Sequence, residues 1–70
     1  MLTTYIGKTL TVGNKTHEES FVITKHVKTS HGTRFFGAEK YNQWIVSPDE
    51  LKAIRQNGTY SCERYYITIK

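Results

Sequence analysis

The stretch that decides the fold is Trp44-Ile45-Val46-Ser47-Pro48-Asp49-Glu50-Leu51. Its second half holds the signals of a helix start. Ser47 is a favourable N-cap, because its hydroxyl can accept a hydrogen bond from an unpaired backbone N–H of the first turn. Pro48 at the first helical position loses no hydrogen bond there. Glu50 follows the cap by three residues, the spacing of a capping box in which the carboxylate accepts from the cap's own N–H.

Apolar spacing and a glycine set the length of this helix. Val46 before the cap and Leu51 at the fourth helical position have the spacing of a hydrophobic staple. Gly58 can adopt the left-handed conformation that ends a helix. The sequence therefore predicts one short helix, Pro48–Asn57, whose Leu51 and Ile54 side chains face a sheet.

The rest of the chain has the composition and alternation of β-strands. Five segments are predicted as strands: Leu2–Val12, Phe21–Lys28, Arg34–Ala38, Gln43–Val46 and Thr59–Ile69. In the second of them, Phe21, Ile23 and Val27 form the more apolar face, which we expect to point inward. Lys25 falls on the same face, which indicates a strand end, an open edge or a bulge near it.

Three details refine this prediction. Gly7 is expected to bend or divide the first strand, and the polar stretch Ser61–Arg64 the last. In the third strand, Phe36 and Ala38 share one face while Phe35 lies on the other. A hairpin loop is expected over Thr29–Thr33.

Four strands, a helix and a last strand with short connections force antiparallel neighbours. This order over residues 1–70 resembles the SH3-like small barrels, with a helix before the last strand. The resemblance implies a single, mainly β domain: a five-stranded antiparallel barrel closed by pairing of the first and last strands. The alternatives are an OB-like barrel, whose helix lies between its third and fourth strands, and a curved open sheet packed on one helix.

Composition limits the compartment in which the chain works. The 70 residues are 37% hydrophobic and 23% charged, which suits a folded domain. The single cysteine allows no disulfide within one chain and favours a reducing compartment. The N-terminus lacks a secretory signal, and no apolar run is long enough to span a bilayer. We therefore expect a complete, cytoplasmic chain without membrane partners.

Catalytic and metal-binding patterns are weak. The soft metal-ligand types match no zinc spacing; they are His17, His26, His31 and Cys62. The five glycines stand singly and form no phosphate loop. Since no matched nucleophile and base is visible, we expect neither a cofactor nor enzymatic activity.

The positive charge is concentrated in the middle of the chain. Residues 25–40 hold four cations against one carboxylate, a net charge of +3 within the formal +4 of the whole chain. Cations interleaved with rings are typical of nucleic-acid binding, in which cations contact phosphates and rings stack on bases. The residues predicted to bind are His26, Lys28, Arg34, Phe35, Tyr41 and Trp44. Lys28 and Arg34 would contact phosphates, and His26 would strengthen binding as the pH falls.

Two other functions stay open. The first is a protein–protein interaction module, of the size and style of small phage-encoded inhibitors or adaptors of a host protein, with Phe35, Tyr41, Tyr60 and Tyr66 as interface anchors. The second is a small phosphate-containing ligand held in a barrel mouth or a dimer groove. The sequence leaves the oligomeric state open, and a dimer is possible.

Overall fold

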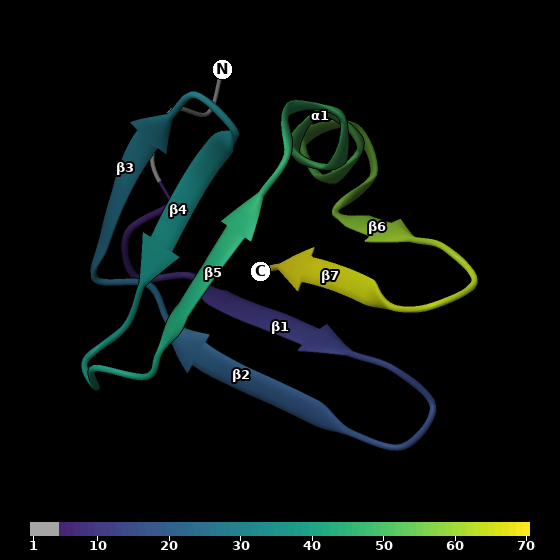
Figure 1. Cartoon of the computed structure of the whole chain (residues 1–70), viewed down its shortest axis with the longest axis horizontal. Helices are drawn as coiled ribbons and strands as arrows, with labels where there is room; N and C mark the ends of the chain where they lie inside the picture. The colour runs from purple at the N-terminus through teal and green to yellow at the C-terminus, as the bar shows by residue number, and fades with distance from the viewer. Residues whose placement is uncertain (1–4) are drawn as a thin grey trace.

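Two antiparallel sheets and a helix make up the computed structural model, which describes residues 5–70 (Figure 1). In chain order the elements are β1 (Thr9–Gly13), β2 (Glu18–Val22), β3 (Lys25–Thr29), β4 (Gly32–Phe36), β5 (Gln43–Val46), α1 (Pro48–Asn57), β6 (Thr59–Ser61) and β7 (Tyr66–Ile69). One sheet has the order β2-β1-β7-β6 and the other the order β3-β4-β5. The prediction of a mainly β chain with one short helix is confirmed.

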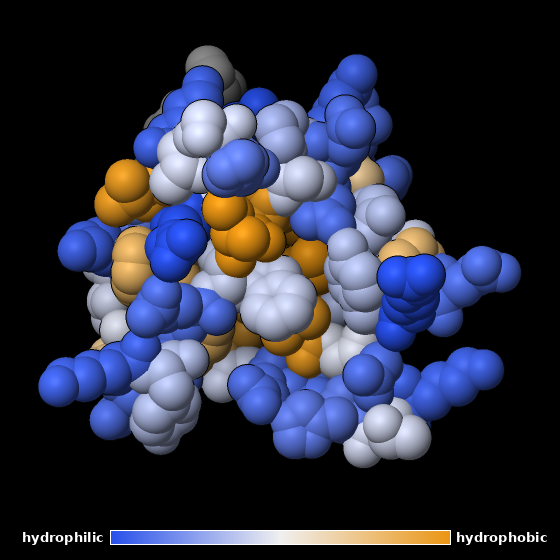
Figure 2. Space-filling model, in the orientation of Figure 1, coloured by the Kyte–Doolittle hydropathy of each residue, from blue (hydrophilic) through white to orange (hydrophobic). Residues whose placement is uncertain are grey.

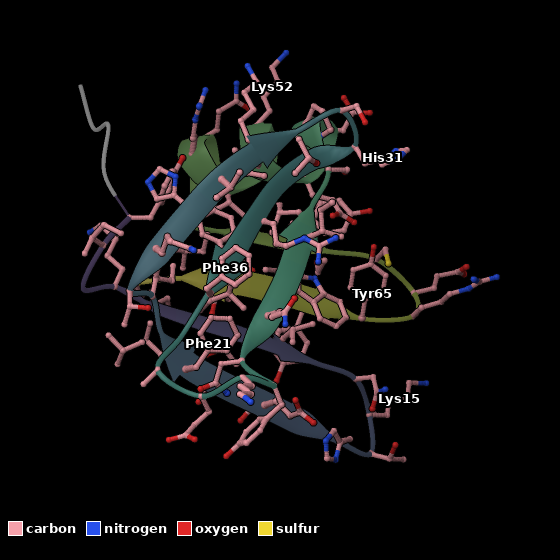
Figure 3. The ribbon with its side chains drawn as sticks, turned by 60° about the vertical axis from the view of Figure 1, so that its left-hand side comes forward. Lys15, Phe21, His31, Phe36, Lys52 and Tyr65 are labelled. Carbon is pink, nitrogen blue, oxygen red and sulfur yellow. The ribbon has the colours of Figure 1, made fainter. Side chains whose placement is uncertain are left out.

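The first and last strands pair as predicted, but the strands do not close a barrel. β1 pairs with β7, with Leu10 opposite Ile69 and Val12 opposite Ile67. Within residues 5–70, β5 pairs only with β4, so the two sheets stay separate. Figure 3 shows the three-stranded sheet crossing in front of the four-stranded one.

The first predicted strand begins later than its alternation indicates. Its residues 1–4 lie outside the described residues, and β1 begins only at Thr9. Gly7 has a φ of 90°, and the N–H of Lys8 donates to the carbonyl of Tyr5 at 3.1 Å, which forms a turn. The turn shifts the alternation by one residue. Tyr5 is therefore buried, and Ile6 is 50% exposed.

The predicted strand Phe21–Lys28 is two strands. The N–H of Ile23 donates to Lys8 in one sheet, and the N–H of Thr24 donates to Phe36 in the other, both at 2.8 Å. The chain thus crosses from sheet to sheet between these two residues. Ile23 is buried as predicted, but the inward placement of Val27 is wrong, because its side chain is 45% exposed beyond the crossing.

The later strands follow the prediction more closely. β5 has the predicted bounds, and the segment Thr59–Ile69 is divided into β6 and β7, as Ser61–Arg64 indicated. β4 begins two residues earlier than expected, at Gly32, so the β3–β4 connection is only residues 30–31. Gly32 has a φ of 140° and lies against the Val46 carbonyl, where a Cβ atom would come within 2.2 Å of the oxygen.

The helix has the predicted bounds, and its capping box is present. The Ser47 hydroxyl accepts from the N–H of Glu50 at 3.3 Å, and Glu50 Oε1 accepts from the N–H of Ser47 at 3.0 Å. Gly58 ends the helix with a φ of 85° and donates its N–H to Ile54 at 2.7 Å. The second carboxylate oxygen of Glu50 accepts from the Tyr65 hydroxyl, so the helix start is also tied to the β6–β7 turn.

The core lies between the two sheets and is covered by one side of α1. Leu51 and Ile54 contribute the helix side, as predicted. The remaining buried members are Tyr5, Leu10, Ile23, Phe35, Val46, Ile67 and Ile69. The ring of Tyr5 meets that of Phe35 edge-on, with centroids 5.3 Å apart, and its hydroxyl accepts from Nε of Arg55 at 3.2 Å.

Candidate functional site

The outward-facing side of the β3-β4-β5 sheet brings cations and apolar side chains together. We call this surface the outer sheet face; its residues are Lys25, Val27, Arg34, Phe36, Gln43 and Ile45. Directly opposite residues of paired strands share a face. The register therefore defines two cross-strand rows, Lys25–Phe36–Gln43 and Val27–Arg34–Ile45. Figure 3 looks onto this face, with Phe36 at its centre.

Specific contacts hold the polar groups of the outer sheet face in place. The Lys25 ammonium lies over the Phe36 ring, 4.9 Å from its centroid, a cation–π geometry. Nη1 of Arg34 donates to Oε1 of Gln43 at 3.2 Å. The Gln43 amide in turn donates to the carbonyl of Lys40 at 3.0 Å. The face and the loop that precedes β5 are thus joined by one chain of hydrogen bonds.

The outer sheet face and the loop that precedes β5 carry an excess of positive charge. Lys25 and Arg34 are the charged members of the outer sheet face, and Lys40 adds a third cation at its end. Lys40 lines a shallow hollow with Lys25 and Phe36, in which Glu39 is the acidic member. The described part of the chain gives none of these three cations a salt-bridge partner. Such a surface attracts polyanions.

The structure separates the residues that were predicted to bind. Arg34 lies on the outer sheet face, but His26, Lys28, Phe35 and Trp44 belong by register to the opposite face. Successive side chains of a strand point to opposite faces, so closeness in sequence does not bring Lys28 and Arg34 onto one surface. Lys28 and Arg34 therefore lie on opposite faces of this sheet.

The predicted rings differ in exposure. Phe35 is fully buried, so its prediction as a stacking ring or interface anchor is wrong. His26 is half-buried, with its ring 5.7 Å from that of Tyr5 and 5.8 Å from that of Phe35. Tyr41, in the loop before β5, is 79% exposed, and Trp44 is 38% exposed. Tyr41 and Trp44 remain available to a ligand.

Trp44 lines a cleft between the two sheets, which we call the inter-sheet cleft. Its walls are Val12, Gly13, Asn14, His17, Glu19, Trp44, Arg64 and Tyr65. Trp44 also borders a shallow hollow with Arg34, Gln43 and Ile45. It is therefore shared by the outer sheet face and the cleft. Figure 2 shows apolar side chains in the middle of this view, where β5 faces β7 in Figure 1, with hydrophilic side chains around them.

Sequence reasoning missed several members of these surfaces. Lys25 was counted among the cations of residues 25–40 but was not named as a phosphate contact, and Phe36 was assigned only to a strand face. Arg64 is far from Trp44 in the sequence. Only Lys25 left a signal, because it is a cation out of phase on an apparently apolar face. Arg64 and Tyr65 reach the cleft through the β6–β7 turn, in which the Cys62 N–H donates to the Tyr65 carbonyl at 2.9 Å.

The remaining reactive groups are dispersed. Backbone N–H groups of Arg64 and Tyr65 lower the pKa of the exposed Cys62 thiol, while burial raises the pKa of the neighbouring Tyr60. His17 Nε2 lies 2.8 Å from Glu19 Oε2 on the surface. Among residues 5–70, no three His, Cys, Asp or Glu side chains are grouped as metal ligands.

Comparison of the chain with protein-family models, with curated proteins and with solved structures finds no match. Within residues 5–70, the helix is too short and too polar to cross a membrane.

Proposed function

We propose that this chain is a non-catalytic binding module that binds nucleic acid on the outer sheet face. The observation that carries the proposal is the placement of Lys25, Arg34 and Lys40 near the half-buried ring of Phe36 and the exposed ring of Tyr41, with Glu39 as the acidic neighbour. Lysine and arginine supply the phosphate contacts on which nucleic-acid affinity mainly depends. Tyr41 and the accessible part of Phe36 are the stacking surfaces.

The proposal extends to the fold and the compartment. We propose an SH3-like small barrel that is left open beside β5. β2 and β3 then correspond to two halves of one sharply bent strand, the first paired with β1 and the second with β4. The pairing of β1 with the last strand and the helix before that strand support this interpretation. The unpaired Cys62 supports a reducing compartment, the cytoplasm.

Fluorescence anisotropy of labelled single-stranded and duplex oligonucleotides, at several salt concentrations, tests the function. Three phosphate contacts give a slope of log affinity against log salt of about −2.1 for a single strand and about −2.7 for a duplex. Lys25→Ala or Arg34→Ala should reduce the magnitude of this slope by about 0.7–0.9.

Lys28→Ala is the matched control, because Lys28 lies on the same strand and on the opposite face. It should leave the slope unchanged. If neither nucleic acid binds below about 100 μM at low salt, where ordinary non-specific binding is already seen, the proposal fails. If Lys28→Ala lowers the slope and Lys25→Ala does not, the site lies on the other face of the sheet.

One observation favours a protein partner as the second candidate. Val27 and Ile45, on either side of Arg34, are exposed aliphatic side chains, and phosphate contacts do not explain them. Arginine is one of the residue types enriched in binding hot spots, and neighbouring contacts that contribute little energy exclude water around such a residue. A chain that binds no oligonucleotide but retains one stoichiometric protein through Arg34 would support this function.

A further inference from the structure

We infer that the nucleic acid is single-stranded and that one unpaired base enters the inter-sheet cleft beside Trp44. This inference rests on the proposed function and adds the class of strand and a base-binding position. It starts from the place of Trp44, which among residues 5–70 is the one residue that borders both the cleft and the hollow containing Arg34 and Gln43.

Trp44 is held on a rigid strand and yet is accessible. It pairs with Phe35 in the register, which places its side chain on the core side of the sheet. Phe35 and Val46 on the same face are fully buried, whereas Trp44 is 38% exposed, and no strand of residues 5–70 pairs with that edge of β5. A large flat ring fixed at the mouth of a cleft suits stacking on a base.

The opposite wall of the cleft offers a second ring and a cation. Tyr65 is held by its hydroxyl, which donates to Glu50 at the helix start. Figure 3 shows Tyr65 on the turn beyond the edge of β5. Arg64 precedes it, is exposed, and has no salt-bridge partner in the described residues. The cleft also contains the Glu19 carboxylate, which lies 2.8 Å from Nε2 of the His17 ring, within hydrogen-bond distance.

These walls discriminate between strand classes. The inter-sheet cleft has a volume of about 420 Å³, within the range of small-molecule sites, so it admits a single base but not a double helix. A base of a duplex would first have to leave its stack, which costs a few kcal/mol, whereas bases of a single strand are already free. A single strand can follow the cations of the outer sheet face, pass the edge of β5 at Trp44 and place its next phosphate near Arg64.

Trp44 is the only tryptophan of the chain, so its fluorescence reports directly on this position. Unlabelled single-stranded and duplex oligonucleotides of one sequence are titrated against the wild-type chain, and anisotropy of labelled copies measures affinity independently. We expect tighter binding of the single strand and quenching of Trp44 only by that strand. Trp44→Leu should weaken single-strand binding by about 5- to 150-fold and leave duplex binding unchanged.

With Arg64 as a fourth phosphate contact, the expected single-strand salt slope becomes about −2.8, and Arg64→Ala should return it to about −2.1. Lys52→Ala, on the exposed side of α1, should not change the slope. Equal affinities for both strand classes, with Trp44 fluorescence unchanged, overturn this inference and leave the proposed function in place. Absence of any anisotropy change overturns the proposed function itself, and the inference with it. The fluorescence of the wild-type chain gives a result even if Trp44→Leu does not fold.

Discussion

Replacing Glu50 with alanine should destabilise the chain far more than replacing its neighbour Asp49. Both carboxylates lie in the first turn of α1, where each gains about 0.3–1 kcal/mol from the helix dipole. Glu50 alone also accepts the N–H of Ser47 and the hydroxyl of Tyr65. Hydrogen bonds to a charged group contribute about 1.5–3 kcal/mol each, and the half-exposed position favours the lower value. We therefore expect Glu50→Ala to cost about 3–4 kcal/mol and Asp49→Ala less than about 1 kcal/mol.

Urea unfolding followed by circular dichroism measures both values. A domain of this length has a total stability of about 3.5–10 kcal/mol, so Glu50→Ala should remove a large part of it. Tyr65→Phe removes one of the two bonds and should cost little once Glu50 is already alanine. If Glu50→Ala and Asp49→Ala agree within about 0.5 kcal/mol, the two hydrogen bonds do not stabilise the fold and the reasoning is wrong.

Three further predictions concern stability. Leu51→Ala should cost about 2–5 kcal/mol in urea unfolding, because it opens a cavity under the helix, whereas an unchanged midpoint would contradict the core assignment. Gly32→Ala should lower the free energy of unfolding clearly more than Gly58→Ala does. Both glycines have a positive φ, which alone costs an alanine about 1–2 kcal/mol. Only at Gly32 would the added Cβ atom also collide with backbone atoms. The hydrogen bond to Glu50 raises the pKa of Tyr65 from 10.0 to about 12. Since this folded-state pKa lies above the unfolded value, the stabilisation is complete below pH 10 and is lost as the pH rises toward 12. The free energy of unfolding should therefore fall across that range, and it should fall less in Tyr65→Phe.

Local signals predicted those parts of the fold that local interactions determine. The capping box, Pro48 and Gly58 act within a few residues, and they set the helix bounds that the structure shows. The break between β2 and β3 depends on the sheet to which each backbone N–H donates. The acceptors, the carbonyls of Lys8 and Phe36, are distant in the sequence from Ile23 and Thr24. Alternation divided the β4 side chains between two faces. It did not predict which face points into the core, because each face carries one phenylalanine. Packing of Phe35 against Tyr5 settles that choice.

The candidate site was predictable only in its general region. Net charge located the cations of residues 25–40 correctly, but charge counting ignores the pleat that separates Lys28 from Arg34. The inter-sheet cleft could not be predicted, since Arg64 meets Trp44 only through tertiary packing. Charge in the sequence thus indicates a region, while the strand register decides which cations can act together.

The pairing of β1 with β7 determines how this chain must fold. Every other strand pair in residues 5–70 joins neighbours in the sequence. Bringing Val12 against Ile67 closes a loop of about fifty residues, with an entropic cost of about 3–4 kcal/mol, whereas the β3–β4 hairpin closes through a two-residue turn. The hairpins and the helix can therefore form early. We expect the pairing of β1 with β7 to be the slow kinetic step and to bring the Arg64–Tyr65 turn to Trp44.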